Sequence, residues 1–205
     1  MTPKWLEWAG RLQSIAQAGL TYSTDKYDLE RFEQIKDLSA EILINHSSSE
    51  EEKIRMIIED ERGYLTPKID IRSVVIKDNR ILLIREKIDG RWALPGGWAD
   101  VNNSVSENAA RECFEEAGAE VLPGRIIAIL TANRHNDPFL LYTTYKIFVE
   151  CEFVKSEFKE NIETYEAAFF ALDEIPELST GRTSMKQINM CFEAHKQKLF
   201  ETIFD

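Results

Sequence analysis

Hydrophobic residues change their spacing about a third of the way along this chain. From Trp5 to Arg62 they recur mostly at steps of three and four residues, which is the spacing of amphipathic helices. Gly63 and Pro67 interrupt this pattern, and the apolar residues beyond them fall in short segments rich in β-branched and aromatic side chains. We therefore predict a small helical domain over residues 1–66 and an α/β domain over residues 67–205.

The short apolar segments are predicted to be strands, with helices between some of them. Their positions are 71–76, 81–86, 92–95, 125–132, 142–153 and 167–172. Two helices are expected, from about Val105 to Ala117 and from about Ser184 to Phe200. In the N-terminal part, Ser49 and Glu52 have the spacing of a capping box and predict the start of a third helix.

Composition and charge exclude several classes of protein for this chain. With 43% apolar and 30% charged residues among 205, the chain is typical of a soluble globular protein, and no apolar run approaches the roughly 18 residues of a membrane helix. The net charge of −11 disfavours binding along nucleic acid, whereas a small anionic substrate is compatible if a divalent cation screens the acids. Three cysteines without CxxC spacing argue against a disulfide framework and a zinc site. We predict a reduced, cytoplasmic protein.

One segment, GGWADVNNSVSENAARECFEEAG over residues 96–118, carries the strongest candidate chemistry. Ser104 and Glu107 form a capping box at the start of the predicted helix, and Gly118 supplies its C-terminal cap. The helix is expected to bury its apolar residues, namely Val105, Ala109, Ala110, Cys113, Phe114 and Ala117. The charged residues then lie on its other side.

The charged side of this helix contains three glutamates. Glu112, Glu115 and Glu116 stand at helical neighbour spacings, so their carboxylates are expected to project from one face. Repulsion between them destabilises the helix and a cation reverses that effect; hard oxygen ligands suit Mg²⁺ or Mn²⁺. A glutamate-rich helix face is usually only solvated, but here a Gly-Gly turn precedes the helix and Arg111 adjoins the first acid. The pattern therefore favours a metal site.

These residues resemble the signature of the Nudix hydrolases, G-x5-E-x7-R-E-U-x-E-E-x-G-U, in which U is apolar. The matching positions are Gly97, Arg111, Glu112, Cys113, Glu115, Glu116, Gly118 and Ala119. Asn103 departs from the pattern, because the family has a glutamate there. The three acids that bind metal in the family are present, so the departure affects a secondary contact more than the activity.

The resemblance covers nearly the whole chain. Segments similar to a bacterial Nudix subgroup with a helical N-terminal domain are IAQAGLTYSTDKYDLERFEQI, GYLTPKIDIRSVVI, WALPGGWADV and FFALDEIPELSTGR. It implies the Nudix α/β/α sandwich with a mixed sheet, preceded by a small all-helical domain. It also implies a homodimer formed through the N-terminal helices; the alternative is that these helices only pack on the main domain.

The reaction implied by the resemblance is hydrolysis of a nucleoside diphosphate linked to another moiety. In this reading one or more Mg²⁺ or Mn²⁺ ions are held by Glu112, Glu115 and Glu116. The main-chain oxygen of Gly96 or Gly97 is a further expected ligand.

Arg111 and two later glutamates complete the expected catalytic residues. Arg111 is expected to orient Glu112 or Glu115, and the alternative is an ordinary i,i+4 pair with Glu115. A general base often comes from outside the signature in this family. The candidates here are Glu163 and Glu166, just before the predicted strand AAFFAL.

Substrate contacts are expected from residues outside the signature helix. The candidates are Asp70, Arg72, Trp98, Asp100, His135, Phe139 and Lys146. Asp70 and Arg72 alternate with apolar residues and so face one side of a strand, either toward substrate or as a surface ion pair. His135 lies in a loop after a strand, and Lys146 reaches either a phosphate or only a strand edge.

The resemblance to this subgroup, whose members act on ADP-ribose or CDP-choline, favours CDP-choline as substrate. Aromatic residues could form a cage for its quaternary ammonium. The aromatic candidates are Trp92, Trp98, Phe139 and Tyr142, although core packing is the commoner role of any one of them. ADP-ribose is the alternative, and the enzymes that hydrolyse it tend to carry a proline closer to the signature than Pro138, which comes 19 residues after Ala119. Processing of RNA ends and non-catalytic nucleotide sensing are two further hypotheses.

Overall fold

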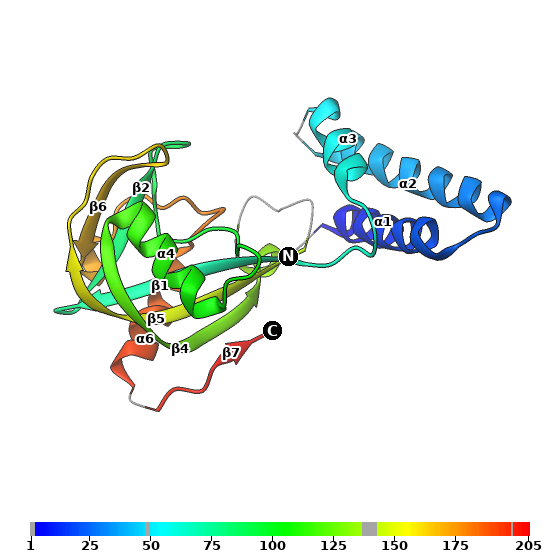
Figure 1. Cartoon of the computed structure of the whole chain (residues 1–205). Coiled ribbons are helices and arrows are strands. Elements are labelled where there is room, and N and C mark those ends of the chain that lie inside the picture. The colour runs from blue at the N-terminus through cyan, green and yellow to red at the C-terminus, as the bar shows by residue number, and fades with distance from the viewer. Residues whose placement is uncertain (1–2, 48–49, 137–142, 198) are drawn as a thin grey trace. The chain divides into compact units, whose positions relative to one another are not determined.

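The computed structural model describes residues 3–47, 50–136, 143–197 and 199–205. The chain divides into two compact units, Met1–Pro67 and Lys68–Asp205. The first unit is helical, and the second combines a mixed sheet with helices (Figure 1). In the described part of the chain, no helix is long and apolar enough to cross a bilayer.

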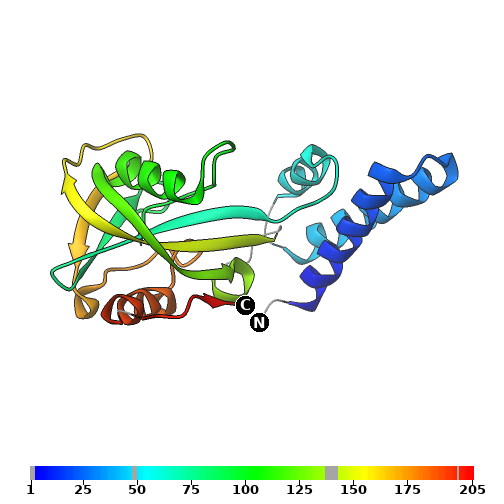
Figure 2. The ribbon, with the colours of Figure 1, turned by 60° about the horizontal axis from the view of Figure 1, so that its bottom comes forward.

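The first unit consists of α1 (Lys4–Tyr22), α2 (Lys26–His46) and α3 (Glu51–Asp60). α1 and α2 lie side by side (Figures 1 and 2) and bury Leu6, Ala9, Ala16, Ala40 and Leu43. Gly19 permits their close approach, because a Cβ there would lie 2.3 Å from the ring of Phe32. Asp25 begins α2 by accepting hydrogen bonds from the main-chain nitrogens of Tyr27 and Asp28.

The predicted third helix is present as α3. Its N-cap residue is Glu50, which makes no side-chain cap bond, and Ser49, the residue predicted to cap it, lies outside the described residues. The helix buries Ile54 and Ile58. It is tied to α1 because Gln17 donates a 3.0 Å hydrogen bond to the main-chain oxygen of Glu61.

The second unit is built on a mixed sheet. Its elements are β1 (Lys68–Lys77), β2 (Arg80–Glu86), β3 (Trp92–Ala93), α4 (Val105–Ala117), β4 (Ala119–Thr131), α5 (Ala132–His135), β5 (Thr144–Ser156), β6 (Thr164–Phe170), η1 (Leu172–Glu174), α6 (Met185–Lys196) and β7 (Ile203–Phe204). The strand order is β3-β2-β1-β5-β4-β7, and β6 also pairs with β2. β1 runs parallel to β5 and antiparallel to β2, so it joins the two halves of the sheet.

Helices cover both faces of this sheet (Figure 1). Successive residues of β1 and β2 point alternately to the two faces, and both sets are buried. α4 packs on the face that contains Val75 and Leu82, whereas α6 packs on the face that contains Val74 and Leu83. The predicted α/β/α sandwich with a mixed sheet and N-terminal helices is confirmed.

Several element bounds differ from those predicted. The strand predicted at 125–132 is longer, since β4 begins directly after α4 and passes Pro123 with shifts of register against β5. The strand predicted at 92–95 forms only two residues, and the helix predicted to reach Phe200 ends at Lys196. β7 carries no signal in the sequence, because two residues are too few to show a period.

Candidate active site

The chain between β3 and α4 runs alongside β1. Main-chain hydrogen bonds of 2.8, 2.8 and 2.9 Å join Ser73 N to Pro95 O, Ile71 N to Gly97 O, and Ala99 N to Ile69 O. The Gly-Gly segment is therefore extended and is not the turn that the sequence predicted. Gly96 has a φ of 141°, and a Cβ there would lie 2.0 Å from the carbonyl oxygen of Ile71, so only glycine fits.

The loop before α4 is held by the buried side chain of Asn108. Its Oδ1 accepts a 2.9 Å hydrogen bond from the main chain of Asp100, and its Nδ2 donates to the main-chain oxygen of Ser104 at 3.1 Å. The predicted capping box at Ser104 is confirmed, and Gly118 ends the helix with a φ of 59°. Asn103 is exposed, and its main-chain oxygen accepts from Asn108 at 3.3 Å.

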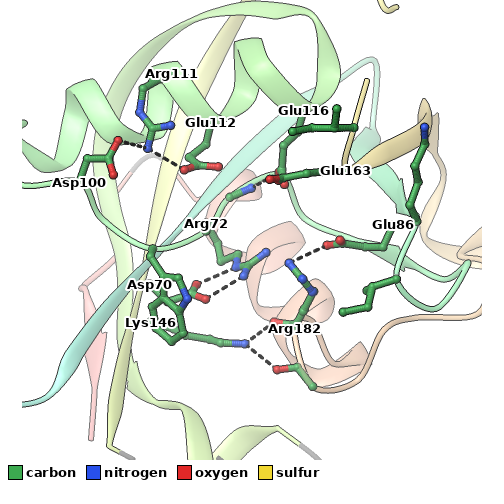
Figure 3. Close-up of a pocket in the computed structure, with 17 residues that line it drawn as sticks. Asp70, Arg72, Glu86, Asp100, Arg111, Glu112, Glu116, Lys146, Glu163 and Arg182 are labelled. Atoms are coloured by element: carbon green, nitrogen blue, oxygen red, sulfur yellow. Dashed lines mark hydrogen bonds and ion pairs between the residues drawn. The ribbon is translucent and has the colours of Figure 1, made fainter. Parts of the chain in front are cut away.

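A pocket of about 770 Å³ lies between α4, the sheet and three loops (Figure 3). The predicted site residues that line it are Asp70, Arg72, Gly96, Gly97, Trp98, Asp100, Arg111, Glu112, Glu116, Lys146 and Glu163. The lining residues that the sequence did not predict are Glu86, Lys87, Ile88, Ile162, Gly181 and Arg182. They come from the end of β2 and from the loops before β6 and α6, so only long-range folding brings them to the pocket.

Glu112 and Glu116 project from α4 into the pocket (Figure 3) and are only 8% and 4% exposed. Oε2 of Glu116 accepts a 2.6 Å hydrogen bond from the main-chain nitrogen of Gly96. Burial raises the pKa of Glu116 to about 8, although Arg72 opposes this shift. Burial also raises the pKa of Glu112, with Arg111 opposing it. Carboxylates whose charged form is disfavoured by burial are stabilised by a cation beside them.

Glu115 does not line the pocket, contrary to the prediction that three carboxylates share one site. Its Oε2 accepts a 2.6 Å hydrogen bond from Nη1 of Arg111, and its side chain is 54% exposed. Within the described residues, no three His, Cys, Asp or Glu side chains are arranged to hold a metal ion. Two carboxylates, those of Glu112 and Glu116, line the pocket. Their oxygens are the ligand type that Mg²⁺ prefers, and Mg²⁺ usually keeps several waters in addition to one or two carboxylates.

Arg111 connects the acids at this end of the pocket. Its Nη2 donates to Oε1 of Glu112 at 2.7 Å and lies 3.2 Å from Oδ2 of Asp100. Its Nη1 bonds to Glu115. Both alternatives from the sequence are therefore present, since Arg111 orients Glu112 and also forms the i,i+4 pair with Glu115.

Asp70 and Arg72 form a buried ion pair and not a surface one. Arg72 donates two hydrogen bonds of 2.7 Å to the carboxylate of Asp70 and a third, of 3.1 Å, to the main-chain oxygen of Leu94. Burial opposes the charge of Arg72, but the field of Asp70 outweighs it, so the pKa of Arg72 is raised. The guanidinium is a fixed positive charge of the pocket wall.

Lys146 is a second buried cation of the pocket, and it is only 1% exposed, so it is not a solvated strand-edge residue. Its Nζ donates to the main-chain oxygen of Gly181 at 3.1 Å and to that of Arg182. Burial lowers the pKa of Lys146 to about 7; Arg72 adds to this shift and Asp70 opposes it.

The two candidates for a general base are separated by the structure. Glu163 lies in the loop before β6 and lines the pocket. Glu166 lies within β6 opposite Arg85, is exposed and does not line the pocket. Glu163 is therefore the candidate that can reach a substrate there.

The aromatic residues predicted to form a cage do not gather at the pocket in the described part of the chain. Trp98 lines it and is 47% exposed. Trp92 is buried in the core instead, with its ring centroid 4.7 Å from that of Phe170 in a T-shaped contact. Phe139 and Tyr142 lie outside the described residues, so their predicted roles remain predictions.

Two other residues differ from their predicted placement. His135 does not line the pocket; its Nε2 lies 2.6 Å from Oδ2 of Asp205, next to β7. Phe114, predicted to be buried by α4, is 59% exposed, and the helix buries Asn108 instead. Helical periodicity finds the apolar face but not its edges. Pro138 lies outside the described residues.

Both parts of the chain match known families. Residues 3–58 match the UDP-X-like N-terminal oligomerisation domain, and residues 67–189 match the NUDIX domain. YjhB of Bacillus subtilis, which is named provisionally as an ADP-ribose pyrophosphatase, is 43% identical over 98% of this chain and 97% of its own. An ADP-ribose pyrophosphatase of Methanocaldococcus jannaschii is 31% identical over 58% of this chain and 70% of its own.

Solved structures agree with these matches. An ADP-ribose pyrophosphatase from Streptococcus suis has 40% identity and a TM-score of 0.64, covering 68% of this chain and 100% of that one. A UDP-X diphosphatase has 29% identity and a TM-score of 0.64, covering 98% of each chain. Family matches over the signature domain and a relative that spans nearly the whole sequence lead to one conclusion: this chain belongs to the Nudix family and is a Nudix pyrophosphohydrolase.

Proposed function

We propose that this enzyme hydrolyses the diphosphate bond of ADP-ribose with a divalent metal ion. The observation that carries the proposal is one pocket in which the buried acids Glu112 and Glu116 lie among the cations Arg72, Lys146 and Arg182. Acids beside cations suit a substrate that brings both a metal ion and phosphate groups. The names of two relatives and of one similar solved structure favour ADP-ribose among such substrates.

Glu112 and Glu116 are the proposed ligands of the metal ion. Nudix hydrolases use divalent metals, typically Mg²⁺, and Mn²⁺ has the same ligand preference. When bound, such an ion neutralises phosphate charge and activates a water molecule. The main-chain oxygen of Gly97 accepts one hydrogen bond, and its second lone pair remains for a ligand; the oxygen of Gly96 is the alternative. The Gly96 N–H fixes Glu116 and Arg111 fixes Glu112.

Glu163 is the proposed general base, because it is an exposed carboxylate on the pocket wall. Arg72, held by Asp70, presents a fixed positive charge to the substrate. An anionic phosphate bound beside Lys146 would raise the pKa of Lys146 and so favour its charged form. Trp98 offers an aromatic face for the nucleoside.

CDP-choline is the second candidate substrate. Trp98 favours it, because an exposed indole binds a quaternary ammonium by a cation–π interaction. Such ligands are usually held by several aromatic side chains, and Trp92 is occupied in the core. CDP-choline therefore ranks below ADP-ribose.

A phosphate-release assay with Mg²⁺ and a coupled phosphatase tests this choice. The substrates are ADP-ribose, CDP-choline, UDP-glucose and short RNA with a diphosphate-linked 5′ cap, none of which has a terminal phosphate, and Glu112→Gln is the control for contaminating activity. We expect kcat/KM for ADP-ribose to exceed the others by at least about tenfold, since a site built for one group rejects others strongly. A preference for CDP-choline would contradict the proposal that ADP-ribose is the substrate. Absence of hydrolysis of all four compounds would favour a non-catalytic nucleotide sensor.

The proposed assembly is a homodimer formed through a dimerisation domain of residues 1–66. Support comes from the match of residues 3–58 to an oligomerisation domain. Support also comes from large apolar side chains that α1 leaves exposed, among them Trp8, Ile15 and Tyr22.

A further inference from the structure

Arg182 reaches the pocket from a loop that is fastened at both ends. Before it, Oγ of Ser179 donates a 2.7 Å hydrogen bond to the carboxylate of Asp89. After it, Oγ1 of Thr183 accepts a 3.0 Å hydrogen bond from the main chain of Leu94. The main chain at Arg182 is therefore fixed, while its side chain extends into the pocket (Figure 3).

The guanidinium of Arg182 has more free donors than the other cations of the pocket. Three of the other cations, Arg72, Arg111 and Lys146, each donate to two or more protein oxygens. The fourth, Lys87, makes a salt bridge with Glu160 and a cation–π contact with Tyr165. The Arg182 side chain is 35% exposed, and within the described residues its guanidinium has one ion-pair partner, Glu86. A guanidinium carries five N–H donors, so several remain for a ligand.

Glu86 pairs with this guanidinium through its charge and not through an aligned hydrogen bond. It is 2% exposed at the end of β2, and its Oε1 lies 3.0 Å from Nη1 of Arg182 without the alignment of a hydrogen bond. Charge-assisted hydrogen bonds with good geometry are the strong form of such pairs, and this pair lacks one. Burial raises the pKa of Glu86, although Arg182 and Arg72 oppose the shift.

We propose that Arg182 binds a phosphate group of the substrate and that Glu86 competes with the substrate for its guanidinium. This role rests on the proposed function, because the anion is the diphosphate of a nucleotide substrate. Glu112 and Glu116 approach the pocket from α4, and Arg182 approaches it from the loop before α6 (Figure 3). The planar fork of arginine can donate two parallel hydrogen bonds to two phosphate oxygens. We expect the phosphate to displace Glu86, because Glu86 makes no aligned hydrogen bond to Arg182.

Calorimetric titration of the full-length enzyme with α,β-methylene-ADP and Mg²⁺ tests the proposal, since this nucleoside diphosphate is not hydrolysed. Arg182→Gln is expected to weaken binding by roughly 10- to 100-fold, and Arg182→Lys by less, because lysine keeps the charge without the fork. Glu86→Gln is expected to bind several-fold more tightly, because the competing charge is gone. The matched control is Arg80→Gln, whose arginine also pairs with a glutamate, Glu174, at 3.0 Å but outside the pocket. The affinity of Arg80→Gln for the probe should equal that of the wild type.

Opposite effects at Arg182 and Glu86 separate a binding role from a structural one. Equal affinity of the wild type and Arg182→Gln would overturn the proposal, as would a wild type that does not bind the probe. An equal loss of affinity in Glu86→Gln and Arg182→Gln would also overturn it, because the pair would then only maintain the loop. If ADP-ribose is not hydrolysed but Arg182→Gln still weakens probe binding, the substrate is rejected and the role of Arg182 stands. Circular dichroism establishes that each variant is folded.

Discussion

Asn161 donates a 2.9 Å hydrogen bond from its Nδ2 to the main-chain oxygen of Glu115, at the C-terminal end of α4. Its Oδ1 accepts hydrogen bonds from the main-chain nitrogens of Glu163 at 3.0 Å and Thr164 at 2.8 Å. One side chain therefore joins the loop of the proposed general base to the helix of the proposed metal ligands. This junction therefore helps to set the distance between those groups, together with a 2.8 Å hydrogen bond from the main-chain nitrogen of Lys87 to the main-chain oxygen of Glu163.

Replacing Asn161 with alanine should lower turnover while the protein remains folded. Release of the loop lets Glu163 move, and displacement of a catalytic group by about 1 Å can cost up to about 100-fold in rate; we expect at least tenfold. The lost hydrogen bonds should lower the free energy of unfolding by only about 1–2 kcal/mol. Steady-state kinetics and urea denaturation measure the two effects. Asn45→Ala is the control, because Asn45 makes a similar 2.8 Å bond to a main-chain oxygen within α2. Unchanged turnover in Asn161→Ala would mean that Asn161 does not position Glu163 for catalysis.

The glutamates of α4 should differ in importance. Glu112→Gln and Glu116→Gln should each lower kcat/KM by at least about 100-fold, as expected for ligands of a catalytic metal. Glu115→Gln should lower kcat/KM by less than about tenfold, because the side chain of Glu115 does not line the pocket and bonds only to Arg111 on the same helix among the contacts described. Kinetics of the three variants at saturating Mg²⁺ make the comparison. A loss at Glu115 equal to the other two would show that Glu115 turns to the metal ion when it binds.

Gly96 and Gly97 should respond differently to alanine. At Gly96 the new Cβ would lie 2.0 Å from the carbonyl oxygen of Ile71, at a φ of 141°. We expect Gly96→Ala to lower the free energy of unfolding by at least about 2 kcal/mol and Tm by at least about 4 °C. At Gly97 the nearest atom is a carboxylate oxygen of Glu112 at 3.4 Å, so Gly97→Ala should fold normally. Thermal unfolding followed by circular dichroism distinguishes them, and equal Tm values would contradict the prediction.

Glu150 should make stability depend on pH in the acid range. Burial acts to raise its pKa, but hydrogen bonds from His195 and Arg125, at 2.8 and 2.7 Å, outweigh it, so the pKa of Glu150 is lowered. A carboxylate with a lowered folded pKa stabilises the protein above its unfolded pKa, and this stabilisation is lost as pH falls through the folded pKa. Glu150→Gln should therefore cost about 1–3 kcal/mol at pH 7 and progressively less below about pH 4.5.

Urea denaturation at a series of pH values measures this difference. Glu120→Gln is the control, because Glu120 pairs with Lys155 at 3.0 Å with both side chains exposed, and such surface pairs contribute about 0–1 kcal/mol. A cost at Glu150 that does not change with pH would mean that packing and not charge is responsible.

Local signals in the sequence predicted the element that carries the site, but not every direction in which its side chains point. Ser104 and Gly118 fix the ends of α4 through their own main-chain bonds, so its bounds follow from nearby residues. Glu115 bonds to Arg111 and lies outside the pocket, and helical spacing alone does not predict which of these two places its side chain takes. Phe114 shows the same limit, because periodicity predicts a face and not its edge.

Long-range contacts explain what the sequence did not predict. Glu86 ends an apolar strand and Arg182 lies far along the chain in a polar loop, and they meet because the strands and loops of the folded sheet bring them to one pocket. Trp92 stands near the Gly-Gly segment in sequence, yet the sheet turns its ring into the core against Phe170. Such positions carry no local motif, so a three-dimensional structure is needed to find them.

Trp8, Ile15 and Tyr22 recur along α1 at the spacing of two helical turns, so they lie on one face of the helix. They are 57%, 53% and 70% exposed, and an exposed apolar stripe of this kind is typical of a helix–helix interface. We expect Ile15→Lys to convert the proposed dimer to a monomer, because it would place a charge within that interface. Light scattering coupled to size-exclusion chromatography measures the mass.

Ser14→Lys is the matched control, because Ser14 is exposed beside Ile15 but belongs to a neighbouring polar stripe. It adds the same charge to the same turn of α1, so a mass change in Ile15→Lys alone locates the interface on the apolar stripe. A dimer that persists in Ile15→Lys would place the interface elsewhere. Monomers from both substitutions would instead mean that added charge on α1 disrupts the helical unit, which circular dichroism would then detect as lost helix.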